Sequence, residues 1–265
     1  GFLGSHLCAR LLKEGNKVTV LDNLSSGDVS NIRAFYENKN FTFRKGNVAE
    51  EIDFKEKFEE IYNLACQASP IKYQKDPIDT LKTSVLGSLN LLEYSLKNNS
   101  KILQASTSEI YGDPIETPQK ENYFGNVNSF GPRSCYDEGK RAAESLFYDF
   151  HSTYNLEIKV SRIFNTYGPN MSSNDGRVIS NFICQALNNQ DLTVYGDGKQ
   201  TRSFCYVDDL INGLIILMNS SKDIYFPINL GNPNELKIIE IANIIIELTN
   251  SNSKVIYKNL PEDDP

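Results

Sequence analysis

Strand-like and helix-like segments alternate along the first two thirds of the chain, and this alternation limits the fold more than any other feature of the sequence. Each strand-like segment is short and largely apolar, and helical spacing of apolar residues follows most of them. Such a succession is typical of parallel strands joined by helices that cover both faces of a sheet. The sequence therefore predicts an α/β protein with a Rossmann-type doubly wound parallel sheet. The predicted strands lie at residues 17–21, 41–44, 61–65, 101–106 and 158–162, and the predicted helices near 32–37 and at 80–96 and 136–154.

The alternation loosens after Pro169. Further helices are predicted near residues 178–188, 208–218 and 238–250, with one strand at 192–195. We therefore expect two domains. Residues 1–169 form a dinucleotide-binding Rossmann domain, and residues 170–265 form mainly a smaller substrate-binding domain.

Composition argues against several classes of partner. The formal net charge of −7 makes the chain a poor candidate for nucleic acid or an anionic membrane, which favour a basic face. Five cysteines without a Cys-x-x-Cys pair fit reduced thiols in a cytoplasmic protein, and two distant histidines make a metal site unexpected. The longest apolar stretches, at 210–218 and 238–248, are short and interrupted by polar residues, so we expect no membrane span.

The first residues have the spacing of a nucleotide-binding turn. Gly1 and Gly4 match the last two glycines of Gly-x-x-Gly-x-x-Gly, where the backbone approaches a pyrophosphate at the start of a helix. Two glycines alone are equally compatible with an ordinary tight turn. Asp22 ends the next predicted strand, 18 residues after Gly4, where an acid can bind an adenine ribose and repel a 2′-phosphate. Together these residues predict an NAD site rather than an NADP site.

Tyr136 and Lys140 form a Tyr-x-x-x-Lys pair on one face of a predicted helix. A surface pair is the plain alternative, but Thr107 follows a predicted buried strand about thirty residues earlier, as in proton-transferring enzymes built on a dinucleotide fold. A tyrosine base needs its pKa lowered from about 10 towards 7, which corresponds to roughly 4 kcal/mol of phenolate stabilisation. We expect the Lys140 ammonium and a positive nicotinamide ring to supply it together.

Several longer strings surround these motifs. Together they resemble the extended short-chain dehydrogenase/reductase family over the whole chain, and within that family the UDP-glucuronate decarboxylases, also called UDP-xylose synthases. The strings are YNLACQASP, STSEIYGDPIETPQ, GNVN, RSCYDEGKRAAE, RIFNTYGPNM, DGRVISNF and VYGDGKQTRSFCYVDDL.

The resemblance implies three groups of site residues. The expected catalytic residues are Thr107, Ser108, Glu109, Tyr136 and Lys140. The expected cofactor contacts are Gly1, Phe2, Leu3, Gly4, Asp22, Asn23, Asn47, Val48, Leu64, Ala65, Tyr136 and Lys140. The expected substrate contacts are Asn165, Arg177 and Arg202.

Some of these implied roles stay open. Arg202 is expected at the diphosphate of the substrate or at its carboxylate, because an arginine fork suits either group. Arg177 is expected at the nucleotide, with a solvated charge as the alternative. Glu109 either transfers a proton or makes a structural hydrogen bond.

The implied reaction is decarboxylation of UDP-glucuronate to UDP-xylose through a 4-keto intermediate, with recycled NAD. The enzyme is then a lyase, because oxidation at carbon 4 is reversed after carbon dioxide leaves. The rival enzymes are a nucleotide-sugar 4,6-dehydratase and a UDP-glucuronate 4-epimerase. A rival of another class is an NAD-binding scaffold or sensor, which would not need the Tyr136 and Lys140 pair.

Two residues weigh against the rival enzymes. Dehydratases of this family typically carry an aspartate where this chain has Ser108. A second carboxylate about 4 Å from a substrate carboxylate would cost on the order of 4 kcal/mol at an effective dielectric of 20. Glu109 weakly disfavours the epimerase, which needs no acid–base group at carbon 5.

The resemblance also implies a homodimer built on the helices predicted at residues 80–96 and 136–154. The family has a strand and another glycine ahead of Gly1 and runs on past Pro261–Pro265, so we expect a chain truncated at both ends. The missing strand would lie centrally in the sheet, and its absence would expose backbone groups that need partners. We therefore expect residues 1–265 alone to bind NAD poorly and to be inactive.

Overall fold

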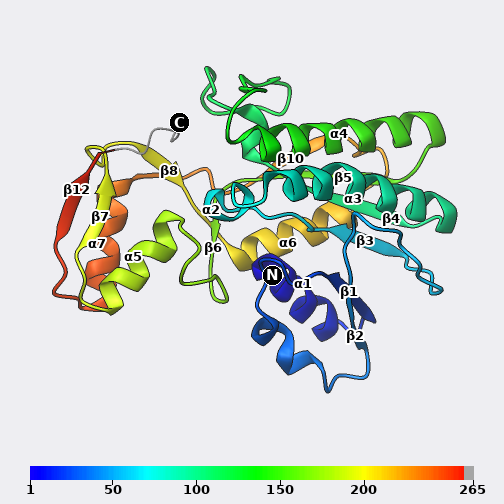
Figure 1. The fold of residues 1–265 in the computed structure, drawn as a ribbon, viewed down its shortest axis with the longest axis horizontal. Helices are drawn as coiled ribbons and strands as arrows, with labels where there is room; N and C mark the ends of the chain where they lie inside the picture. The colour runs from blue at the N-terminus through cyan, green and yellow to red at the C-terminus, as the bar shows by residue number, and fades with distance from the viewer. Residues whose placement is uncertain (260–265) are drawn as a thin grey trace.

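The computed structural model describes residues 1–259 and consists of a larger and a smaller lobe (Figure 1). Pro261–Pro265, where we expected the family to continue, lies outside the described residues. The larger lobe contains a parallel sheet with the order β10-β5-β4-β3, and a separate parallel pair, β1 and β2. This confirms the predicted Rossmann-type α/β fold. The strands are β1 (Val18–Asp22), β2 (Phe41–Lys45), β3 (Glu60–Asn63), β4 (Lys101–Thr107), β5 (Ile158–Ile163) and β10 (Pro227–Leu230).

The parallel strands fall into two groups because β1 and β3 do not pair with each other. Among residues 1–259, β1 pairs only with β2, and β3 pairs only with β4. The residues of both β1 and β3 line one large cavity. On the facing edges of these two strands, the backbone donors and acceptors have no ladder partner among the described residues.

Helices cover both faces of the larger sheet (Figure 1). On one face, α3 (Pro77–Asn98) and α4 (Ser134–Tyr154) pack together over Ile102. On the other face, α1 (Phe2–Lys13) and α6 (Val207–Met218) pack over Leu103. Neighbouring side chains of a strand point to opposite faces, and these two are both 0% exposed. β4 is therefore buried on both sides, as a doubly wound fold requires.

Local signals explain where α3 begins and ends. The Asp76 side chain accepts a hydrogen bond from the Asp79 N–H at 3.1 Å. Pro77 occupies the first turn, where a backbone N–H would have no partner within the helix. Asn99 ends the helix in the left-handed conformation with φ 55°.

The smaller lobe has its own core. α5 (Val178–Leu187) and α7 (Ile238–Thr249) pack against the parallel pair β7 (Leu192–Tyr195) and β12 (Val255–Lys258). Two short ladders connect the lobes: β6 (Thr166–Tyr167) with β9 (Cys205–Tyr206), and β8 (Thr201–Ser203) with β11 (Glu235–Lys237). α6 and β10, which follow Pro169 in sequence, pack in the larger lobe, and the domain boundary at 169/170 stays a prediction.

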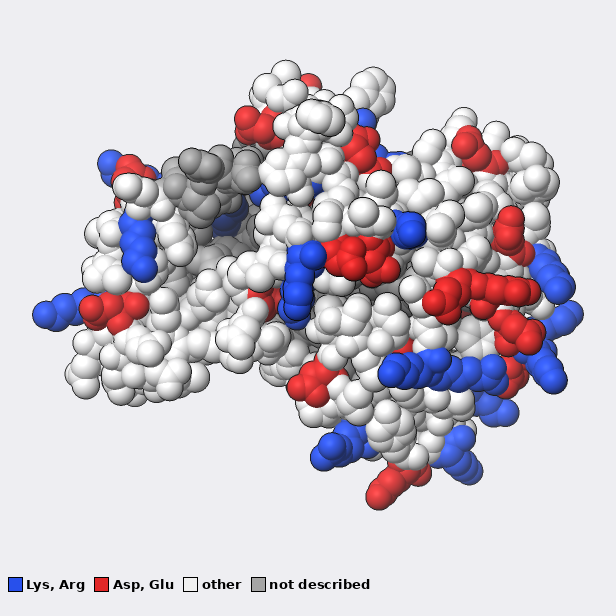
Figure 2. Space-filling model, viewed as in Figure 1, with Lys and Arg blue, Asp and Glu red and all other residues white. Residues whose placement is uncertain are grey.

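The surface in Figure 2 carries basic and acidic side chains intermingled rather than gathered by sign. All five cysteines are free thiols. Within residues 1–259, no three His, Cys, Asp or Glu side chains are grouped so that they could hold a metal ion. None of the helices in that range combines the length and the apolar character needed to cross a bilayer.

Candidate active site

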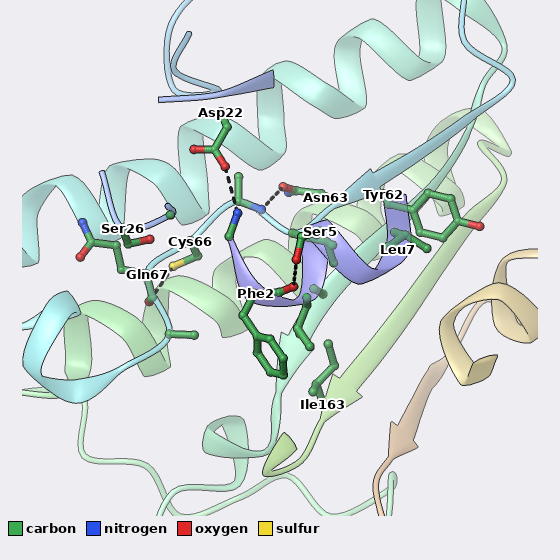
Figure 3. Close-up of a pocket in the computed structure, with 18 of the residues that line it drawn as sticks. Phe2, Ser5, Leu7, Asp22, Ser26, Tyr62, Asn63, Cys66, Gln67 and Ile163 are labelled. Atoms are coloured by element: carbon green, nitrogen blue, oxygen red, sulfur yellow. Dashed lines mark hydrogen bonds and ion pairs between the residues drawn. The ribbon is translucent and has the colours of Figure 1, made fainter. Parts of the chain in front are cut away.

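The start of α1 and the end of β1 form one end of the site. Gly1 caps the helix, and a side chain at Gly4 would meet only Leu64 Cδ1, at 4.0 Å, so a ligand has room to approach the backbone. Asp22 lies beside the start of α1 (Figure 3), and its Oδ1 accepts the Leu24 N–H at 2.7 Å. A helix N-terminus beside an acidic acceptor fits a pyrophosphate and a ribose.

The other expected cofactor residues lie on the loops that follow the strands. Asn23 follows β1, Asn47 follows β2, and Ala65 follows β3, where its N–H donates to Asn63 Oδ1 at 3.2 Å. The carboxyl ends of parallel strands meet at one edge of the sheet, which is where such folds bind ligands. All twelve expected cofactor residues line the same cavity, among them Phe2, Leu3 and Val48.

The expected catalytic residues come from β4 and α4. Thr107 is the last residue of β4, and its Oγ1 accepts the Glu109 N–H at 3.2 Å at the start of the 3₁₀ helix η2 (Ser108–Tyr111). The Thr107 side chain lies near enough to Tyr136 to lower its pKa, and Lys140 Nζ lies 5.8 Å from the Tyr136 ring centre. The structure thus brings the three residues together, and Ser108 and Glu109 line the same cavity.

The protonation of Tyr136 is set by its burial. Burial raises the pKa of Tyr136 above its ordinary value, and Cys66 and Glu109 raise it further, whereas the Thr107 side chain lowers it. The Lys140 ammonium donates to the Ala105 carbonyl oxygen at 2.8 Å. Lowering the pKa of Tyr136 towards neutrality therefore requires more positive charge than the described side chains around it supply.

Three residues beside Tyr136 were not predicted from the sequence. The Tyr73 ring stacks on the Tyr136 ring, with centres 4.8 Å apart and planes inclined by 4°. Arg133 forms an ion pair with Glu109, and Asp137 is buried next to both. Asp137 directly follows Tyr136, and Arg133 lies three residues before it, just ahead of the predicted helix, so closeness along the chain was the available signal. No sequence signal links Tyr73, in the short helix α2 (Pro70–Tyr73), to Tyr136.

The expected substrate residues lie after β5, before α5 and in β8. Arg177 precedes α5 and binds the Asp175 carboxylate through Nε and Nη2. Arg202, in β8, is exposed and donates to the Thr201 carbonyl oxygen at 2.9 Å. Asn165 is exposed, and its carbonyl oxygen accepts the Cys205 N–H at 2.8 Å.

One cavity of about 2250 Å³ therefore holds every residue of the three predicted groups. It extends from the start of α1 past Tyr136 to the smaller lobe, and it includes the space between β1 and β3. Its lining suits a dinucleotide beside Asp22 and an anionic second ligand beside the two arginines. The individual roles of these residues stay predictions.

Comparison with known proteins defines the class. Residues 1–231 match the model of the NAD dependent epimerase/dehydratase family, and the chain belongs to that family. Over its full length it is 48% identical to UDP-glucuronic acid decarboxylase 4 of Arabidopsis thaliana and 47% identical to UDP-glucuronic acid decarboxylase 1 of Xenopus tropicalis. It spans 59% of the length of the plant protein and 62% of the frog protein.

Among solved structures, UDP-glucose 4-epimerase of Thermotoga maritima, determined with UDP-glucose, superimposes with a TM-score of 0.90. The two chains are 28% identical, and the match covers 100% of this chain and 84% of the epimerase.

Proposed function

We propose that the protein is an NAD-dependent carboxy-lyase that converts UDP-glucuronate to UDP-xylose and carbon dioxide. The observation that carries this proposal is the grouping of Thr107, Tyr136 and Lys140 in a cavity that also holds Arg177 and Arg202. The 48% identity to a plant decarboxylase over the whole chain favours this member of the family over the epimerases.

In this proposal, Gly1 and Gly4 at the start of α1 would hold the pyrophosphate of NAD, and Asp22 its adenine ribose. Bound NAD would supply reversible hydride transfer at carbon 4 of the sugar, so the net reaction would be redox neutral. The open backbone at Gly4 and the position of the Asp22 carboxylate in the same cavity support this orientation. The family to which the chain belongs is described as NAD dependent.

Tyr136 acts as the base that removes the proton from the carbon 4 hydroxyl and later returns it. Burial alone keeps Tyr136 protonated, and the positive charge of a bound nicotinamide ring, added to that of Lys140, would favour the ionised form. Thr107 hydrogen-bonds the same substrate hydroxyl. The resulting 4-keto acid has its ketone β to the carboxylate, which makes loss of carbon dioxide easy.

The remaining residues select the substrate. Ser108 is neutral and adds no repulsion to the uronate carboxylate, whereas an aspartate there would. Arg202 binds the diphosphate or the carboxylate, Arg177 the nucleotide, and Asn165 the diphosphate.

We also propose that the protein acts in the cytoplasm as a homodimer. Its free cysteines favour a reducing compartment. Exposed apolar residues on the outer side of α3 and α4, namely Ile78 (67% exposed), Leu81 (41%) and Tyr148 (59%), support a dimer built on these helices. Light scattering should give twice the mass of one chain, and replacement of Ile78 and Leu81 by lysine should give the mass of one.

The test of the reaction is the mass of its product. Full-length protein is incubated with UDP-glucuronate without an added reductant, and the nucleotide sugar is identified by mass spectrometry. A UDP-pentose is expected, with loss of that product in Tyr136→Phe and an unchanged circular dichroism spectrum. An altered sugar of unchanged mass would instead identify the 4-epimerase. If UDP-glucuronate is untouched, neutral nucleotide hexoses test the dehydratase, and failure there too leaves a binding protein.

A further inference from the structure

A largely buried ion pair lies beside the expected catalytic residues and belongs to none of the three predicted groups. Arg162 in β5 binds Glu144 in α4 by two hydrogen bonds, Nε to Oε1 at 3.1 Å and Nη2 to Oε2 at 2.8 Å. The two side chains are only 10% and 14% exposed. Apolar side chains in place of such a pair often leave a protein equally stable, because taking two charges out of water costs about as much as their attraction gains. Stability alone therefore does not account for this pair.

Glu144 continues the row of expected catalytic residues on α4. It follows Lys140 by four residues, just as Lys140 follows Tyr136, so the three side chains lie on one face of the helix. Glu144 Oε1 also accepts a hydrogen bond from the Ser106 hydroxyl at 2.5 Å. Ser106 directly precedes Thr107, the last residue of β4. The Glu144 carboxylate therefore ties α4 to the end of β4 that carries Thr107.

Arg162 ties a third segment to the same point. Its Nη1 donates to the Tyr111 hydroxyl at 3.0 Å and to the Glu121 carbonyl oxygen at 2.9 Å. Tyr111 is 1% exposed and is the last residue of η2, which also contains Ser108 and Glu109. The ion pair thus joins β4, η2 and α4, the three segments that carry all five expected catalytic residues.

The geometry of the pair makes this connection directional. Two hydrogen bonds from a planar guanidinium fix both the distance and the angle between the groups that they join, whereas a single charge contact leaves the angle free. A catalytic base must lie within hydrogen-bond reach of the proton that it removes. A displacement of about 1 Å can slow such a reaction about 100-fold. A pair that holds α4 against β4 and η2 therefore acts on the rate of the reaction rather than on the binding of a ligand.

We infer that Arg162 and Glu144 are positioning residues for the proposed reaction. Their ion pair holds Tyr136 in the position relative to Thr107 and Glu109 that proton transfer requires. Neither member of the pair is among the described residues that line the cavity, so both act through the residues that they bind. This inference rests on the proposed function, in which Tyr136 removes a proton from the sugar.

The test separates stability from alignment. In full-length protein, Arg162→Met leaves a buried carboxylate without its cation and should lower Tm by about 10 °C. The double variant Glu144→Leu/Arg162→Met removes both charges and should recover most of that loss. Its kcat for UDP-glucuronate should nevertheless stay about 100-fold below that of the unaltered protein. KM and the Kd for NAD, measured by calorimetry, should stay within about threefold, because the binding residues are unchanged.

A smaller change probes the link to β4 alone. Ser106→Ala removes only the hydroxyl that donates to Glu144, and kcat should fall on the order of tenfold at unchanged KM. The matched control is Ser161→Ala, which removes another buried hydroxyl, next to Arg162, that donates to the Gln104 carbonyl oxygen at 3.4 Å. This control should leave kcat unchanged.

Three outcomes would overturn the inference. If kcat recovers together with Tm in the double variant, the ion pair has only a structural role. A rise in KM or in the Kd for NAD that accounts for the lost activity would show that the pair acts on binding. If the unaltered protein does not convert UDP-glucuronate at all, the proposed function itself is wrong, and this inference with it.

Discussion

At the scale of single residues, the arginine expected to contact the nucleotide is already held in place by a neighbour. The Asp175 carboxylate binds Arg177 at two positions, and Asp175 is 6% exposed. The buried Ser69 hydroxyl donates to the Asp175 carbonyl oxygen at 2.6 Å, and Gly176, with φ +85°, leaves no space for a side chain beside Ile71. The guanidinium is thus oriented by a segment anchored to α2 in the other lobe.

Asp175→Asn should weaken substrate binding without slowing the chemistry. The amide keeps the shape of the carboxylate but loses the charge-assisted fork that orients Arg177, so we expect KM for UDP-glucuronate to rise about tenfold and kcat to stay within about twofold. Steady-state kinetics measure both values. The control is Asp197→Asn, which removes an exposed aspartate paired with Lys199 at the same sequence spacing and should leave KM unchanged. A fall in kcat with constant KM would contradict the assignment.

Asp137 should also make stability depend on pH. Its pKa rises from the ordinary 3.8 to about 7 in the folded protein, so folding favours the protonated form. The contribution of protonated Asp137 to the free energy of unfolding is fully present below pH 4. It is lost as the pH rises through 7, by at most about 1.4 kcal/mol per pH unit. Asp137→Asn should therefore gain stability relative to the unaltered protein between pH 5 and pH 8, by roughly 1–3 kcal/mol in urea unfolding. If the difference in unfolding free energy between the two proteins is the same at pH 5 and at pH 8, this prediction is wrong.

At the scale of elements, close packing of α3 depends on a glycine within the helix. A methyl group at Gly87 would lie 2.7 Å from Val48 Cγ2, in the loop after β2. A methyl group at Gly213, within α6, would lie 3.4 Å from Leu230, an ordinary contact. The two helices therefore respond differently to the same substitution.

Gly87→Ala should destabilise the protein by about 1 kcal/mol. The gain in helix propensity is about 0.5–1 kcal/mol, but overpacking against Val48 costs about 1–3 kcal/mol. Gly213→Ala gains helix propensity without overpacking against a neighbour, so it should stabilise the protein by about 0.5 kcal/mol. Thermal unfolding of the two variants gives the comparison, and equal shifts of the same sign would show that packing at Gly87 is not limiting.

At the scale of the whole molecule, residues 1–265 expressed alone should show the division of the parallel strands in hydrogen exchange. β4 pairs on both sides, with β3 and β5, whereas β1 pairs on one side only. We expect the amides of β4 to exchange at least about tenfold more slowly than those of β1, because a strand with a free edge opens at lower cost. Exchange followed by mass spectrometry of peptides measures this. Equal protection of the two strands would mean that the edge of β1 is covered in solution.

The elements with strong local patterns could be predicted from the sequence. The long helices α3 and α4 and the buried strands β4 and β5 lie where the spacing of apolar residues predicted them. β10 and β12 were not predicted from the sequence. An ordinary helix was expected near Ile32, where the structure has the 3₁₀ helix η1 (Val29–Phe35). β10 has four residues and is ordered by its pairing with β5, a partner far away in the sequence.

The sequence by itself determined the alternation of elements, the glycine turn with Asp22, and the placement of Tyr136 and Lys140 on one helical face, because each depends on spacing along a single segment. Only the tertiary structure decided that Tyr73 stacks on Tyr136, that Arg133 pairs with Glu109, and that Asp137 is buried without a partner. Burial and charge pairing depend on which distant segments pack together. The protonation of the site is therefore a property of the folded molecule, whereas the identity of its reactive groups can be read along the chain.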